Sequence, residues 1–117
     1  MDTLLLVLQI LLALHTLMGA VWKFTNTVEA VPTLRAMGNA VWRGLGVFEL
    51  ALVALLIVPL FVEGLGVFVA VGAFGVVLEM VFFSVLHLRS GAKEHGSMIY
   101  WLVVAALAGT LGVIGLA

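Results

Sequence analysis

Four long apolar runs constrain the fold of this chain more than any other feature of its sequence. They cover residues 3–24, 41–62, 65–88 and 98–116. A helix rises 1.5 Å per residue, so each run is long enough to cross a hydrocarbon core of about 30 Å. Membrane β-strands alternate in polarity and run for only about 10 residues, which does not match these runs. The sequence therefore predicts an all-α membrane protein, a four-transmembrane-helix bundle that forms a single domain over residues 1–117.

Composition excludes several other classes of protein. Hydrophobic residues make up 65% of the chain and charged residues only 9%, against roughly 25% charged in an ordinary soluble domain. A net charge of -1 leaves no basic surface for nucleic acid. The chain has no cysteine, so it carries neither disulfides nor thiolate metal sites. The expected surroundings are a lipid bilayer.

The first run differs from a signal peptide. It carries Gln9 and His15 and lacks a basic leader, so we expect it to be retained as a span.

The basic residues predict an orientation. All five lie at the ends of the runs, or in the connections, on one side of the predicted bundle: Lys23, Arg35, Arg43, Arg89 and Lys93. Positive residues favour the cytoplasmic side, so we expect both long connections to be cytoplasmic and both termini to lie outside a bacterial inner membrane. On the same side we expect an aromatic belt of Trp22, Trp42, Tyr100 and Trp101.

The connection at residues 25–39 has a pattern of its own. Apolar residues recur every three positions from Val28 to Met37, with Glu29 and Arg35 on the other side. This pattern suits a short helix lying in the membrane interface and ending at Gly38. An irregular loop is an equally good interpretation for a connection of this length.

Three ionisable residues inside the runs carry most of the remaining information. His15, Glu49 and Glu79 each lie six to eight residues from the basic end of their run, which corresponds to a depth of roughly 9–12 Å. One imidazole and two carboxylates from three helices thus share a layer. Because ionisable groups in hydrocarbon cost several kcal/mol, each needs a partner or a role.

Glycines accompany these residues one helical turn away. Gly19 follows His15 by four, Gly46 precedes Glu49 by three, and Gly75 precedes Glu79 by four, with Gly72 on the same face. Small residues let helices approach closely, or leave room for a ligand beside a carboxylate.

The layer admits several interpretations. His15, Glu49 and Glu79 could anchor a polar ligand, relay protons, act as an acid/base pair, or hold the helices in register as hydrogen-bonding residues. We place functional roles ahead of a purely structural one. The sequence does not favour a metal site, because no run has the Glu-x-x-His spacing of di-iron bundles.

The other polar residues have simpler explanations. We expect Gln9 to link two helices, and Lys23 and Arg43 to extend toward the interface. We expect His87 to be solvated or to face lipid headgroups.

The layout resembles that of the DoxX-like family of small four-helix membrane proteins. The similarity lies in GAVWKF at residues 19–24, WRGLGVFEL at 42–50 and HLRSG at 87–91. The resemblance implies that Glu49 and Lys23 match the family pattern, and that His87 does so less securely. Some relatives are described as subunits of quinone-linked oxidoreductases, and others as helpers of membrane-protein assembly.

Our first functional hypothesis is a non-catalytic protein that binds a lipid-like or quinone-like molecule through His15, Glu49, Glu79 and Lys23, or that acts as an accessory subunit of a membrane redox complex. A membrane-embedded acid/base enzyme of the isomerase type is an alternative. A membrane-protein assembly factor and a proton-coupled transporter, which would have to be a homo-oligomer, are further alternatives.

Overall fold

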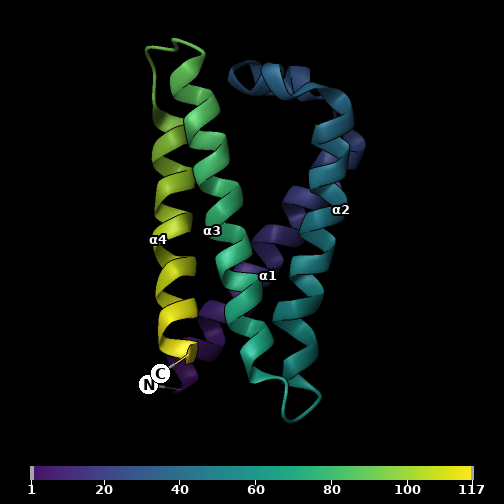
Figure 1. Ribbon diagram of the computed structural model, residues 1–117, viewed down its shortest axis with the longest axis vertical. Coiled ribbons are helices and arrows are strands. Elements are labelled where there is room, and N and C mark those ends of the chain that lie inside the picture. The colour runs from purple at the N-terminus through teal and green to yellow at the C-terminus, as the bar shows by residue number, and fades with distance from the viewer. Residues whose placement is uncertain (1, 117) are drawn as a thin grey trace.

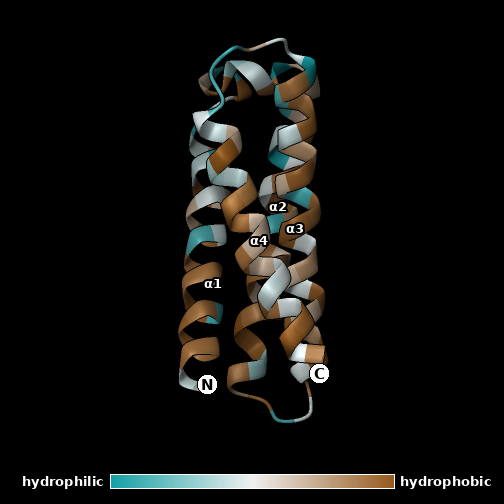
Figure 2. Cartoon of the chain, turned by 90° about the vertical axis from the view of Figure 1, so that its left-hand side faces the viewer, coloured by the Kyte–Doolittle hydropathy of each residue, from teal (hydrophilic) through white to brown (hydrophobic). Residues whose placement is uncertain are grey.

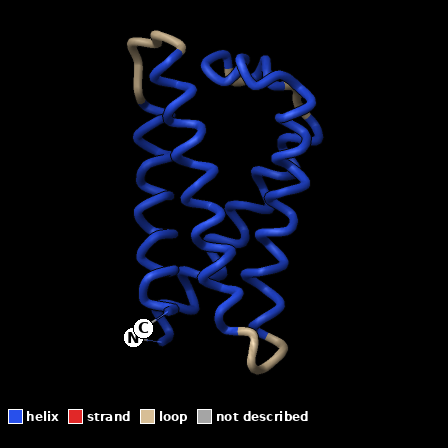
Figure 3. The backbone as a smooth tube through the Cα atoms, viewed as in Figure 1, coloured by secondary structure: helices blue, strands red, loops and turns tan. Residues whose placement is uncertain are grey.

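The computed structural model of the protein describes residues 2–116, and four long helices account for most of them (Figure 1). They are α1 (Asp2–Thr25), α2 (Gly38–Ile57), α3 (Gly66–Arg89) and α4 (Gly96–Leu116). Three short 3-10 helices lie between them: η1 (Val28–Ala30), η2 (Pro32–Met37) and η3 (Val58–Leu60). The described residues contain no strand, so the predicted all-helical fold is confirmed (Figure 3).

The helices are built to cross a bilayer. All four are long and apolar enough to do so. The molecule is 43 Å long, which matches the 40–45 Å thickness of a bilayer with its headgroups. Every helix also points large apolar side chains outward, for example Met18, Val47, Leu78 and Val113, which are 60–70% exposed. Such a surface suits lipid rather than water, and the protein is an integral membrane protein.

The hydropathy of the surface also differs between the helices and the connections. Figure 2 is brown over most of the helical surface, while teal collects in the connections at one end. We call this end, which carries residues 26–37 and 90–95, the basic end. Residues 2 and 116 lie at the opposite end together with the turn between α2 and α3, as the alternation of four spans predicts (Figure 1).

The second predicted span differs from the structure at both ends. The helix begins at Gly38 instead of residue 41, and its α-helical part ends at Ile57 instead of residue 62. Pro59 explains the early end, because a proline lacks the N–H that would continue the α-helical ladder, and the chain proceeds as η3. Gly38 marks the sharp change from η2 into α2, with a φ of 74° that favours glycine.

The four helices pack as two pairs. α1 lies mainly against α2, and α3 lies mainly against α4, while α2 and α3 join the pairs in the middle. α1 and α4 make few contacts with each other, and Figure 1 shows the two pairs diverging toward the basic end. The two helix pairs are therefore farthest apart where the polar residues are concentrated.

The connection between α1 and α2 covers this divergence. The helix η2 contacts both α2 and α3, and Val28 and Leu34 are buried beneath the connection. The predicted helical character of this segment is confirmed, and its spacing of three suits 3-10 turns. Its apolar residues Val28 and Leu34 face the bundle. We call this connection, residues 26–37, the roof.

Candidate functional site

A buried ion pair between the first two helices is the centre of the candidate site. Lys23 on α1 donates a hydrogen bond from Nζ to Oε2 of Glu49 on α2 at 3.2 Å. Oε1 of Glu49 lies 3.0 Å from the same nitrogen, at an angle that suits an ion pair but not a hydrogen bond. Both side chains are 5% exposed or less. The pair is thus withdrawn from water, and in a dry site neither charge is stable without the other.

The roof explains why the predicted position of Lys23 is wrong. We had expected its long side chain to extend to the interface, because it lies only two residues from the end of α1. Instead the ammonium group points inward, 5.0 Å above the Trp42 ring and 4.9 Å from the Phe83 ring. These rings stabilise the cation through their π faces.

Small residues let the two helices meet at this pair. A Cβ atom on Gly19 would lie 3.3 Å from Oε2 of Glu49, so the carboxylate rests directly against the α1 backbone. A Cβ on Gly46 would lie 3.1 Å from the Phe24 ring and 3.4 Å from Cβ of Lys23. Both glycines therefore allow a close approach of α1 and α2 beside the charges.

The other two predicted glycines serve a different helix pair. A Cβ on Gly72 would lie 3.1–3.3 Å from atoms of Leu52, Leu55 and Leu56, and one on Gly75 would collide with the Leu52 side chain. Both positions lie where α3 packs on α2. They set the distance between these helices and, through it, the position of Glu79 one turn further along α3.

A chamber of about 160 Å³ adjoins the ion pair. Residues from all four helices and from the roof line it: His15, Trp22, Lys23, Val31, Leu34, Trp42, Glu49, Met80, Phe83, Tyr100 and Trp101. Three of the four predicted site residues, His15, Lys23 and Glu49, thus line one cavity. The His15 ring lies 5.5 Å from the ring of Tyr100 across the seam between α1 and α4.

Glu79 belongs to the same charged group but not to the chamber wall. Its side chain is 3% exposed, and its charge interacts with those of Glu49 and Lys23. Among residues 2–116, neither carboxyl oxygen of Glu79 has a hydrogen-bond partner. Nδ1 of His15 has none there either. Unpartnered buried polar atoms call for a proton, a water or a ligand.

Two tryptophans that we expected in an aromatic belt belong to this chamber instead. Trp42 is 1% exposed and Trp101 is 9% exposed, whereas Trp22 and Tyr100 reach the outer surface. The Trp42 indole nitrogen donates to the carbonyl of Asn26 at 3.0 Å, which ties α2 to the start of the roof. The belt prediction is therefore wrong for Trp42, which bonds to the start of the roof, and for Trp101, whose ring packs against those of Phe83 and His87.

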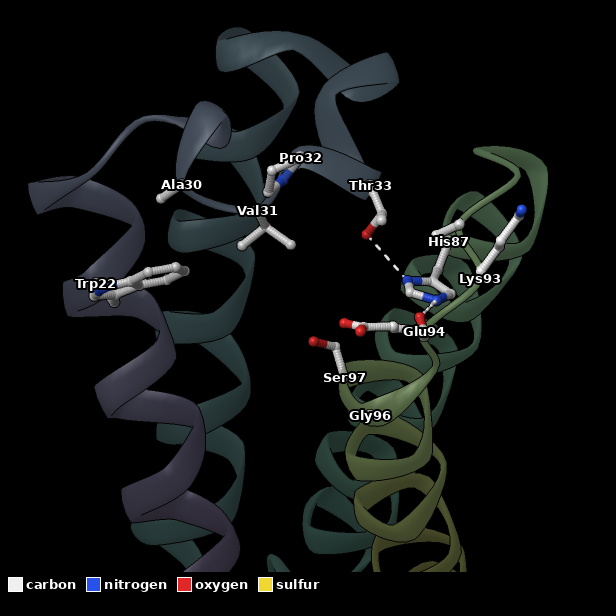
Figure 4. Close-up of a pocket in the computed structure, with 11 residues that line it drawn as sticks. Trp22, Ala30, Val31, Pro32, Thr33, His87, Lys93, Glu94, Gly96 and Ser97 are labelled. Carbon is white, nitrogen blue, oxygen red and sulfur yellow. Dashed lines mark hydrogen bonds between the residues drawn. The ribbon is translucent and has the colours of Figure 1, made fainter.

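A wider mouth of about 690 Å³ lies above the chamber at the basic end. It shares Trp22 and Val31 with the chamber. Figure 4 shows two side chains pointing into it, Glu94 from the connection between α3 and α4 and Ser97 from the first turn of α4. The mouth thus connects the chamber with the membrane surface at the basic end.

His87 forms one wall of the mouth, and its predicted solvation is wrong. It is 3% exposed, and its Nδ1 lies 3.1 Å from the Thr33 hydroxyl of the roof (Figure 4). Its Nε2 lies 2.9 Å from the Glu94 carbonyl and 3.1 Å from Nδ1 of His95. His87 therefore fastens the roof to the connection between α3 and α4.

Gln9 has the linking role that its sequence position predicted. Its amide donates to the carbonyl of Leu56 at 2.6 Å. Pro59 cannot supply an N–H to that last turn of α2, so the bond from α1 satisfies a carbonyl there.

The described residues contain no group of three or more His, Asp or Glu side chains arranged to hold a metal ion.

Comparison with known proteins matches nearly all of the helical region to one family. The model of the DoxX-like family matches residues 7–116. No curated protein and no solved structure matches the chain. The matched region includes α1 from residue 7 onward, the other three long helices, the roof and all residues of the chamber.

Proposed function

The chain belongs to the DoxX-like family, and on that premise we propose that it binds a lipid-like or quinone-like molecule without transforming it. The observation that carries this proposal is the chamber, a small aromatic and charged cavity between the four helices of an apolar bundle. Ligand sites are typically concave, largely apolar and provided with a few convergent polar groups. In this proposal residues 1–117 act as a single transmembrane domain.

The ligand would place its polar end beside Lys23 and Glu49. His15, with its unpartnered Nδ1, would supply a further hydrogen bond. Glu79, which lies behind the chamber wall, would affect the charge of Glu49 and Lys23. A groove of about 250 Å³ between α1 and α4 would hold the apolar part, since it shares His15 and Tyr100 with the chamber. The polar and apolar cavities therefore meet at one pair of rings.

Retention of a ligand during purification tests the proposal. We expect lipid-sensitive mass spectrometry of the protein, purified in a mild neutral detergent, to find a bound amphiphile that Glu49→Gln loses. Glu63→Gln is the matched control, because Glu63 is an exposed carboxylate at the opposite end. A wild-type protein without retained ligand, combined with an unchanged stability of Glu49→Gln, would refute the proposal.

An acid/base enzyme is the second candidate, favoured by the interaction between the Glu49 and Glu79 carboxyls. Two coupled carboxyls can hold and release one proton in turn, which an isomerisation requires. In that case Glu79→Gln would abolish turnover of a bound substrate while leaving its retention intact. An accessory subunit of a membrane oxidoreductase would use the same chamber to present a quinone-like molecule to a partner.

We further propose that the basic end faces the cytoplasm of a bacterium and that both termini lie outside. The charge bias supports this orientation, because the basic residues lie at one end of the bundle. The natural chain contains no cysteine, so single cysteines report their side without background. Ser97→Cys should react with an impermeant maleimide only after the cells are opened, and Glu63→Cys should react in intact spheroplasts. The reverse pattern would invert the orientation.

A further inference from the structure

We propose that the chamber selects a cationic amphiphile, an alkylammonium compound whose head lies among the aromatic rings and whose tail lies in the groove between α1 and α4. This inference rests on the proposed function and names the chemical class of its ligand. Three independent features carry it: the charge count of the buried group, the chemistry of the chamber wall and the position of the groove.

The buried charges do not balance. Lys23 supplies one positive charge, while Glu49 and Glu79 supply two carboxyl groups that interact with each other. The group is therefore neutral only when it holds one additional cation, which is either a proton or the head of a ligand. The two carboxylate oxygens of Glu49 lie 3.0 and 3.2 Å from Nζ of Lys23. The ammonium group is therefore already paired and is not available to an anionic ligand.

The chamber wall is suited to an ammonium group. Five of its residues are aromatic: Trp22, Trp42, Phe83, Tyr100 and Trp101. Aromatic faces attract ammonium groups, and cages of such rings recognise quaternary ammonium ligands. Two of these rings already contact the Lys23 ammonium, which shows that the wall accommodates a cation in this setting.

The size of the chamber restricts the head group. The chamber has a volume of about 160 Å³. A compact alkylammonium head fits this volume. A phosphate-bearing head would bring negative charge next to two carboxyls, so anionic and zwitterionic phospholipids are disfavoured.

The groove between α1 and α4 has the shape of a site for an alkyl chain. Apart from His15 and Tyr100, its wall is aliphatic: Leu8, Leu11, Leu12, Val103, Val104 and Leu107. Leu8 and His15 lie seven residues apart, a distance of about 10 Å along α1. Since α1 and α4 make few contacts, a chain can enter this seam directly from the bilayer.

Three probes with the same alkyl chain test the inference: decyltrimethylammonium, decanol and decyl sulfate. The full chain in a neutral maltoside detergent is titrated with each probe, and partition into empty micelles is subtracted. All three tryptophans of the chain line the chamber, so their emission reports its occupancy. We expect the cation to bind at least ten-fold more tightly than the alcohol, and the sulfate to bind most weakly.

The source of the selectivity is tested by variants and by proton release. Glu79→Gln should weaken binding of the cation about ten-fold and leave binding of decanol unchanged, whereas Glu63→Gln should change neither. Calorimetry in buffers of different ionisation enthalpy should show protons released when decyltrimethylammonium, a permanent cation, binds. The titratable groups of the chamber wall are His15 and Lys23 from α1, Glu49 from α2 and Tyr100 from α4. Glu79 from α3 lies behind the wall and interacts with Glu49 and Lys23.

Each outcome discriminates between the two proposals. Decanol or decyl sulfate binding as tightly as the cation would overturn the inference but leave the proposed function standing. If none of the three probes binds saturably and the purified protein retains no ligand, both proposals are overturned. The selectivity is measured on the unmodified chain, so it does not depend on whether Glu79→Gln folds.

Discussion

Separating the two partners of the buried ion pair gives the strongest test of the site. Three variants form a double-mutant cycle: Lys23→Met, Glu49→Gln and the double variant. Each single change leaves one charge in a dry site without its main partner. The double change removes both charges and retains side chains of similar volume.

The structure sets the expected size of these effects. At 3.0 Å and an effective dielectric constant of about 20, the two charges attract each other by about 5.5 kcal/mol. Breaking a buried pair from one side typically costs about 3–5 kcal/mol, because the remaining charge stays desolvated. Glu49→Gln should lie at the lower end of this range, since Glu79 also interacts with Lys23. The double variant should remain within about 2 kcal/mol of the wild type.

Unfolding in mixed micelles of maltoside and dodecyl sulfate, followed by tryptophan emission, measures these free energies. The chain also offers a matched exposed pair, because Arg35 and Glu29 lie 3.9 Å apart with both side chains more than 60% exposed. The cycle of Glu29→Gln and Arg35→Met should give a coupling energy below about 1 kcal/mol. Our reasoning is refuted if the buried cycle gives a coupling energy as small as the exposed one, because the pair would then be solvated.

Two further predictions concern helix packing. Gly75→Ala should lower the free energy of unfolding by about 1–3 kcal/mol, because its Cβ would force the buried Leu52 side chain to move. Gly44→Ala on α2 meets no atom within 4 Å and should be neutral or raise stability by up to about 1 kcal/mol; equal effects of the two changes would contradict this account. Gln9→Leu should cost about 1 kcal/mol in the same unfolding assay, since the Leu56 carbonyl loses its donor, and an unchanged stability would mean that water replaces the bond.

Depth along each helix was the part of the site that the sequence could predict. Counting residues from the basic end placed His15 and Glu49 in one layer, and in the structure both line one chamber. The same count applied to Glu79, which lies near them but behind the wall. Counting gives the height of a residue and not its rotation about the helix axis, so it could not separate a residue in the wall from one behind it.

The roof is the reason why other residues were misjudged. A lysine or histidine near the end of a span normally reaches water, and local sequence gives no sign that a distant segment will cover it. Lys23 and His87 are buried because residues 26–37 fold back over the bundle, with Thr33 against His87. One signal was available: the spacing of three from Val28 to Met37 marks an apolar side that requires a surface to pack on.

The position of the ion pair also bears on how the protein is assembled in the membrane. Lys23 lies two residues from the basic end of α1, so α1 can insert with its charge near the headgroups, whereas Glu49 lies deeper in α2, where an ionised carboxylate needs a partner. The charges meet only when α1 and α2 come together and the roof closes. The pair is thus absent from the isolated helices, and its formation selects the one register of α1 against α2 in which both charges are neutralised.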